Sequence, residues 1–154
     1  LRFSPFIKDV MVLGDATRPW VGALVNIDMG VASRWAEERR IAFSTFTDLS
    51  QRPEIRALVR DEIARINAFL PEGSRVVRFA NFPKELDADE GELTRTRKLR
   101  REFLEQRYRA LIEGLYVGAT DIDCQIAVTY QDGRQGVLRA KVTGTDVITA
   151  AGTT

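Results

Sequence analysis

The chain has 154 residues, of which 44% are hydrophobic and 29% charged, the balance of one globular domain with a core of its own. It carries 23 lysines and arginines against 22 acidic residues, and the net charge of +1 predicts no whole-molecule attraction to nucleic acid or membrane. The sequence holds no histidine and a single cysteine, Cys124, which excludes His-based triads, His-based zinc sites and internal disulfides.

Two apolar runs, 10–13 and 20–27, open the chain and are separated by a stop at Gly14 and a turn. Short apolar runs bounded by turn residues are typical of buried strands, and the short connection predicts an antiparallel pair. Asp28 follows the second run and is suited to cap a helix that continues to about residue 39.

The segment 41–48 is ambiguous, and we expect its two phenylalanines to cover the core from a loop. A helix with a clear apolar stripe follows, with Ser50 or a neighbour as its cap, Pro53 in its first turn and its end at 71–73. Its apolar residues recur at the helical period: Ile55, Leu58, Val59, Ile63, Ile66 and Phe69.

The second half of the chain predicts a strand at 75–80, an acidic turn-like stretch at 85–92 and one helix at 99–115. Apolar and polar residues then alternate over 122–142, which predicts a β-hairpin, and the last residues, through Thr154, are expected to be frayed. This order of elements predicts an α+β fold. We expect a small antiparallel or mixed sheet packed with about three helices, plus the C-terminal β-hairpin.

A run of basic residues lies where a loop is predicted to enter the last helix. Five of the seven residues from 95 to 101 are basic: Arg95, Arg97, Lys98, Arg100 and Arg101. Backbone N–H groups at the start of a helix attract anions, so this place suits phosphate or carboxylate groups. Alternatively, the run is a solvated face that the acidic stretch 85–92 neutralises.

The same segment carries a family resemblance. Residues 91–101 read GELT-x-T-x-KL-x-R, which resembles the last signature of long-chain acyl-CoA synthetases in the adenylate-forming (AMP-binding) superfamily. Segment 4–15 resembles the part of these enzymes that follows the interdomain hinge. Further weak matches occur in the same order as in the family, at 18–19, 35–36, 53–55, 108 and 112–116. The resemblance covers about residues 3–116.

The resemblance implies that residues 1–154 are the small C-terminal lid domain of a longer enzyme. Residues 117–154 would be a hairpin extension and tail, and the large N-terminal domain that binds ATP and the acyl group would lie outside the sequence. In this family, the lysine at the position of Lys98 reaches into the large domain. There it binds the substrate carboxylate and the α-phosphate side of ATP while acyl-adenylate forms, and a rotation of the lid then allows thioester formation with CoA.

Other residues of the motif are given lesser roles. Thr96, Arg97, Arg100 and Arg101 are candidates for binding substrate or phosphate, although the family usually has proline in place of Arg95 and an apolar residue in place of Arg97. We expect Thr94 and Thr96 to hold the shape of the loop, and Glu92 to pair with an arginine. Trp20, Trp35 and Cys124 are expected in the core, and we expect no metal ligands.

For the full-length enzyme, the resemblance implies a fatty-acid–CoA ligase of lipid metabolism that uses ATP, Mg²⁺ and CoA. Its lid would have its own N-terminal adenylation domain as partner and would not bind nucleic acid. The fragment alone is predicted to be inactive and to hold no cofactor. The single cysteine fits a cytoplasmic protein, and peripheral membrane contact of the parent enzyme stays open.

Two alternative functions stay open at this point. The chain could be the lid of another acid–CoA ligase of the same superfamily, because the residues that select the acyl chain would lie in the other domain. It could instead be a non-enzymatic module that binds RNA or another phosphate through the patch 95–101, although RNA-binding modules interleave aromatic residues and this patch has none. The hairpin 122–142 could extend the main sheet or pair with another chain.

Overall fold

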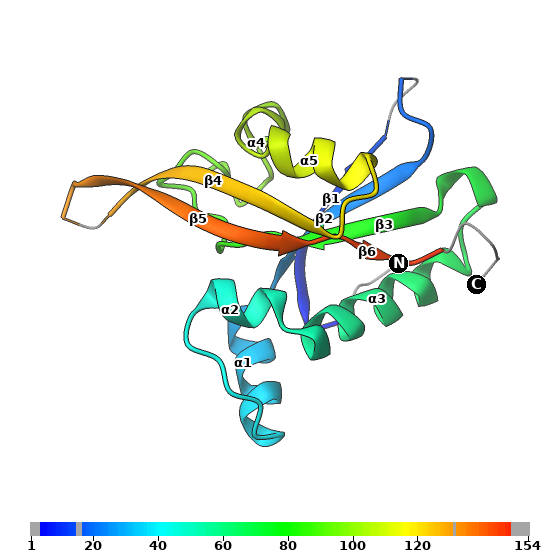
Figure 1. Ribbon diagram of the computed structural model, residues 1–154, viewed down its shortest axis with the longest axis horizontal. Helices are drawn as coiled ribbons and strands as arrows, with labels where there is room; N and C mark the ends of the chain where they lie inside the picture. The colour runs from blue at the N-terminus through cyan, green and yellow to red at the C-terminus, as the bar shows by residue number, and fades with distance from the viewer. Residues whose placement is uncertain (1–3, 15–16, 131, 149–154) are drawn as a thin grey trace.

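The computed structural model describes residues 4–14, 17–130 and 132–148 and contains two sheets (Figure 1). One sheet has four strands in the order β1-β2-β3-β6, and the other is the hairpin formed by β4 (Asp121–Thr129) and β5 (Gln135–Thr143). The described residues also form five α-helices, so the predicted α+β class and the C-terminal hairpin are confirmed.

The four-stranded sheet is mixed. Strands β1 (Ile7–Leu13) and β2 (Val21–Ile27) pair antiparallel, as the sequence predicted. Strand β3 (Val76–Asn81) joins β2 in parallel, and the short β6 (Thr145–Asp146) pairs antiparallel with β3. The central strand β2 is buried on both faces, which explains its nearly continuous apolar sequence.

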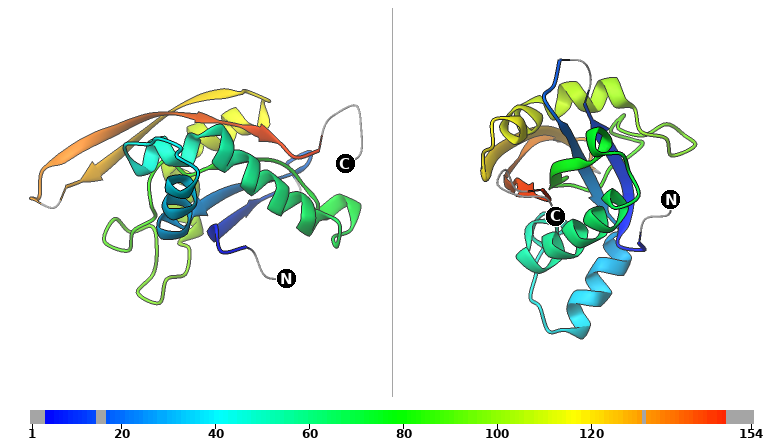
Figure 2. Two further views of the ribbon diagram at one scale, coloured as in Figure 1. Left: turned by 90° about the horizontal axis from the view of Figure 1, so that it is seen from below. Right: turned by 90° about the vertical axis from the view of Figure 1, so that its right-hand side faces the viewer.

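Helices cover both faces of this sheet (Figures 1 and 2). One face packs against α1 (Met29–Glu38), α2 (Phe46–Gln51) and α3 (Pro53–Asn67). The other packs against α4 (Arg101–Arg107), α5 (Arg109–Tyr116) and the inner face of the hairpin. Two apolar cores therefore lie back to back across the sheet.

The first helices differ in part from the sequence prediction. The Asp28 side chain accepts a hydrogen bond from the Val31 N–H at 3.0 Å, so its predicted capping role is confirmed. The expectation of a loop up to residue 48 is wrong, because Thr45 caps α2 and the helix buries Leu49. Ser50 does not cap α3: it is buried inside α2, and Arg52 holds the N-cap position without a side-chain hydrogen bond.

The predicted last helix is divided into α4 and α5 by a break at Tyr108, whose backbone leaves the helical region at φ −106° and ψ 23°. The fully buried Tyr108 ring packs edge-on against Phe82 with 4.9 Å between centroids, and its hydroxyl donates to Glu92 at 3.1 Å. Both contacts join segments distant in sequence, so the helical periodicity of this region gave no sign of the break.

The hairpin β4–β5 forms a sheet of its own and extends away from the body (Figure 2). It therefore does not extend the main sheet; β6 does so instead. The expected fraying is wrong for residues 145–148, because β6 pairs with β3, Asp146 forms an ion pair with Arg78 at 2.8 Å, and Val147 is buried. The remainder of the expected frayed tail, 149–154, lies outside the described residues.

Candidate functional site

Lys98 lies on a short loop whose base is closed by backbone pairing. Leu93 and Leu99 form an antiparallel bridge, and the Thr94 N–H donates to the Lys98 carbonyl at 2.8 Å. The Thr94 hydroxyl oxygen accepts from the Lys98 N–H at 3.0 Å and lies 3.2 Å from the Thr96 hydroxyl. The two threonines therefore hold the shape of this loop, which agrees with the expectation from the sequence.

The side chain of Lys98 is exposed. Within the described part of the chain, no hydrogen bond or ion pair engages its ammonium group, although its backbone N–H and carbonyl are both bound to Thr94. The loop runs into α4 three residues later, so the predicted position before a helix is confirmed. The backbone of Lys98 is thus held by hydrogen bonds, while its ammonium group is bound to no other group of the described residues.

Two of the other basic side chains, those of Arg97 and Arg101, contact strand β1 of the same domain. Arg97 has a positive φ of 65°, and its guanidinium lies 3.2 Å from the Asp9 carboxylate on β1. Arg101 donates to the carbonyl of Val12 on the same strand and pairs with Glu105 at 3.0 Å. The basic run is therefore not a uniform cationic patch, because two of its guanidinium groups are bound within the domain.

The remaining basic residues of the run, Arg95 and Arg100, are exposed. Arg100 lies over the ring of Phe103, with 5.9 Å between the guanidinium carbon and the ring centroid. Together with Lys98, these two side chains form the outward-facing cationic part of the segment.

A buried carboxylate lies directly before the loop. Glu92 has no exposed surface, and its oxygens contact the Lys84 ammonium, the Asp87 N–H, the Tyr108 hydroxyl and the Arg107 guanidinium. The expectation that Glu92 pairs with an arginine is confirmed. Burial and the Glu92 charge raise the pKa of Tyr108 far above its ordinary value, so the hydroxyl stays protonated and donates.

Sequence reasoning missed Lys84 and the role of Tyr108 in this cluster. The two residues lie 8 and 16 positions from Glu92 in the chain, Lys84 after β3 and Tyr108 between α4 and α5. No local sequence pattern marks this cluster, because the fold brings its members together from separate segments.

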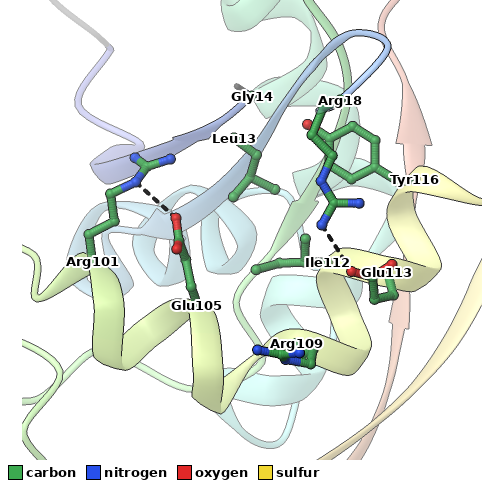
Figure 3. A pocket seen from close by; sticks show the side chains of 9 residues that line it. All are labelled: Leu13, Gly14, Arg18, Arg101, Glu105, Arg109, Ile112, Glu113 and Tyr116. Carbon is green, nitrogen blue, oxygen red and sulfur yellow. Dashed lines mark hydrogen bonds and ion pairs between the residues drawn. The ribbon is translucent and has the colours of Figure 1, made fainter. Parts of the chain in front are cut away.

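A cavity of about 340 Å³ lies between the end of β1 and helices α4 and α5 (Figure 3). Three arginines from three segments line it: Arg18, Arg101 and Arg109. Arg18 pairs with Glu113 at 2.9 Å and lies over the Tyr116 ring, and Arg101 pairs with Glu105. Because these carboxylates offset two of the three cations, we assign no anionic ligand to this cavity.

Other classes of site gain no support from the described residues. Burial raises the pKa of the Cys124 thiol to about 11, which fits the expected inert core cysteine. Across ranges 4–14, 17–130 and 132–148, the acidic side chains and Cys124 form no group of three that could hold a metal ion. None of the helices described is both long enough and apolar enough to cross a membrane.

The fold resembles part of the adenylation domains of carboxylic acid reductases. It superposes with a TM-score of 0.56 on the A-PCP didomain of the Segniliparus rugosus enzyme in complex with AMP, at 17% identity, over 74% of this chain and 14% of that one. The adenylation domain of the Mycobacterium chelonae carboxylate reductase gives the same TM-score at 22% identity, over 74% of this chain and 16% of that chain. At these identities the similarity concerns the fold alone.

In sequence, the chain is similar to long-chain-fatty-acid–CoA ligase FadD15 of Mycobacterium tuberculosis, with 29% identity over 117 residues. FadD15 of Mycobacterium bovis matches to the same extent. The match covers 75% of this chain and 19% of the ligase, so the chain spans about a fifth of the length of these relatives. No family model matches the chain. The resemblance to acyl-CoA synthetases indicated by the motifs is confirmed by this similarity.

Proposed function

We propose that this chain is the mobile C-terminal domain of an ATP-dependent long-chain fatty-acid–CoA ligase, and that Lys98 serves the formation of acyl-adenylate. One observation carries the proposal: Lys98 lies on a loop whose backbone is held by hydrogen bonds, and its ammonium group is exposed and bound to no other group of the described residues. The similarity to ligases that act on long-chain fatty acids supports this class of reaction.

The chemistry explains why a lysine suits this task. In acyl-adenylate formation, a fatty-acid carboxylate oxygen bonds to the α-phosphorus of ATP while the bond from that phosphorus to pyrophosphate breaks. The two reacting groups are both anionic and repel each other. A compact ammonium between them offsets this repulsion and fixes their orientation without giving or taking a proton.

The other motif residues divide into two groups in this proposal. Thr96 and Arg100 are exposed and stay candidates for contact with substrate phosphates. Arg97 and Arg101 contact β1, so we propose that they chiefly hold the loop against the sheet. An RNA-binding function for this patch gains no support, because these two guanidinium groups are engaged within the domain.

The domain is proposed to act in two poses against its own N-terminal adenylation domain. In the first pose Lys98 enters the active site for adenylation by MgATP. In the second the domain rotates, withdraws Lys98 and lets the CoA thiol attack the acyl carbonyl, which releases AMP. The chain alone would then lack most of the active site, and we expect it to be inactive in isolation.

The test uses the full-length protein with Lys98→Ala and measures its two half-reactions separately. We expect acyl-adenylate formation to fall by about 100-fold or more, while thioester formation from supplied acyl-adenylate is retained. Arg95→Ala is the matched control, since it removes a second exposed cation from the same loop. Equal adenylation rates in wild type and Lys98→Ala would overturn the proposal.

A further inference from the structure

The buried carboxylate of Glu92 is connected to side chains from two other parts of the fold, the segment after β3 and the junction of α4 with α5. Lys84 lies just after β3, Arg107 ends α4, and Tyr108 occupies the break between α4 and α5. The Arg107 Nε lies 3.2 Å from one carboxylate oxygen, which also accepts from the Tyr108 hydroxyl at 3.1 Å. The other oxygen contacts Lys84 and accepts from the Asp87 N–H at 3.1 Å.

The backbone of Glu92 is bound on both sides as well. Its N–H donates to the Asp87 carbonyl at 3.1 Å, and its carbonyl accepts from the Arg100 N–H at 3.0 Å. Glu92 and Arg100 thus form the next backbone contact outside the bridge between Leu93 and Leu99. Lys98 is two residues from Arg100, so fixing Glu92 fixes the place from which Lys98 projects.

A charged group in such a place requires a reason, because burying a carboxylate is costly unless every oxygen is paired. Here the side chains of Lys84 and Arg107 are only 16% and 12% exposed and supply the opposite charge. Such clusters often add little net stability compared with apolar packing, and in some proteins their role is to restrict the arrangement of the segments that they join. The tip of the loop is held separately, by Arg97 and Asp9.

We infer that Glu92 is a positioning residue for Lys98: with Lys84, Arg107 and Tyr108 it holds the base of the loop so that the ammonium is presented in one place. The inference rests on the proposed function. It predicts that weakening the cluster harms adenylation selectively, since a displacement of the reacting lysine matters only in the half-reaction that uses it.

The test compares three variants with wild type. Glu92→Gln keeps the size of the side chain but removes its charge, and Tyr108→Phe removes one hydrogen bond while keeping the ring on Phe82. Asn67→Ala is the stability control. The buried amide of Asn67 binds the backbone N–H and carbonyl of Val76, and it lies on the face of the sheet opposite to α4 and α5. Tyr108→Phe keeps the test informative if Glu92→Gln folds poorly.

The first readout is amide hydrogen exchange in this chain. In Glu92→Gln we expect the protection of the Thr94 and Arg100 amides to fall at least about tenfold more than that of Leu24 in the centre of β2. Tyr108→Phe should give a smaller change of the same pattern. A uniform loss across all three amides, as expected for Asn67→Ala, would overturn the inference and leave Glu92 a purely structural residue.

The second readout is the pair of half-reactions in the full-length protein. We expect Glu92→Gln to slow adenylate formation about 10- to 100-fold with thioester formation unchanged, and Asn67→Ala to change neither selectively. If Lys98→Ala abolishes adenylation but Glu92→Gln leaves it intact, the positioning role is wrong and the proposed function stands. If Lys98→Ala has no effect on adenylation, both are wrong.

Discussion

At the scale of single residues, Lys98 differs from its neighbours in what its side chain contacts. Arg97 and Arg101 are bound to β1, whereas the ammonium of Lys98 faces outward from a backbone held by Thr94. A lysine that acts on a substrate bound by another domain needs a backbone held in one place and an ammonium group free to contact that substrate. The geometry of attack depends on both.

The hydroxyl of Thr94 should be a measurable part of this arrangement. We expect Thr94→Ala to lower the local stability of the loop by about 1 kcal/mol, since it removes the acceptor of the Lys98 N–H. Thr94→Ser keeps that acceptor and should behave as wild type. Hydrogen exchange at the Lys98 amide measures the difference, and equal protection in both variants would contradict the role assigned to the hydroxyl.

Cys124 gives a pH-dependent prediction. Its folded pKa of about 11 lies above the unfolded value of 9.0, so the folded state retains the thiol proton where the unfolded chain has lost it. The stability contribution is therefore complete below about pH 9 and is lost as the pH rises toward about 11. Urea denaturation across this range should show a steeper decline for wild type than for Cys124→Ala, and parallel curves would refute the assignment.

At the scale of elements, α5 lies unusually close to β4. A Cβ built at Gly114 would lie 2.7 Å from Cγ2 of Ile122, closer than real side-chain contacts allow. The glycine therefore permits the hairpin to pack on the helix, and the inner face of β4 buries Ile122, Cys124 and Ile126 in that contact.

Gly114→Ala should accordingly cost about 1–3 kcal/mol of unfolding free energy, because the helix and the hairpin must move apart. Gly73→Ala is the matched control, since no heavy atom of the described residues lies within 4 Å of its added Cβ and its φ is not positive. Chemical denaturation of both variants makes the comparison. A Gly114→Ala variant as stable as Gly73→Ala would show that the close approach is not required.

The elements that sequence patterns predicted are those with a strong local period. The strand pair at the start, α3 with its helical stripe, and the alternating hairpin all follow from spacing within one segment. Three features depend instead on contacts between distant segments: β6 pairing with β3, the break at Tyr108, and the burial of Glu92. The motif alone identified Lys98 as the candidate, whereas the partners of Glu92 could be identified only from the folded structure.

At the scale of the whole molecule, the hairpin belongs to the same body as the rest of the described chain. Its inner face packs with α4 and α5 in one apolar core, its base is held by a hydrogen bond from the Thr143 N–H to Gln51, and the chain after it supplies β6. Only its outer part extends beyond this core (Figure 2).

Two deletions should therefore have opposite results. Replacing residues 129–135 with an Asn-Gly turn shortens the exposed end and should leave a cooperative unfolding transition. Deleting 120–148 removes one wall of the apolar core as well as β6, and we expect loss of cooperative folding. Near-ultraviolet circular dichroism during thermal unfolding distinguishes the outcomes. A stable, well-packed product of the longer deletion would show that the hairpin is a separate attachment.

The most direct measurement of the central claim replaces Lys98 with cysteine in the full-length protein and then restores an ammonium by aminoethylation of that cysteine. The readout is fatty-acid-dependent exchange of pyrophosphate into ATP, with wild type taken through the same treatment as the control. We predict that Lys98→Cys lowers exchange by about 100-fold or more and that aminoethylation returns most of it. Exchange at the wild-type rate in Lys98→Cys before treatment would contradict the account.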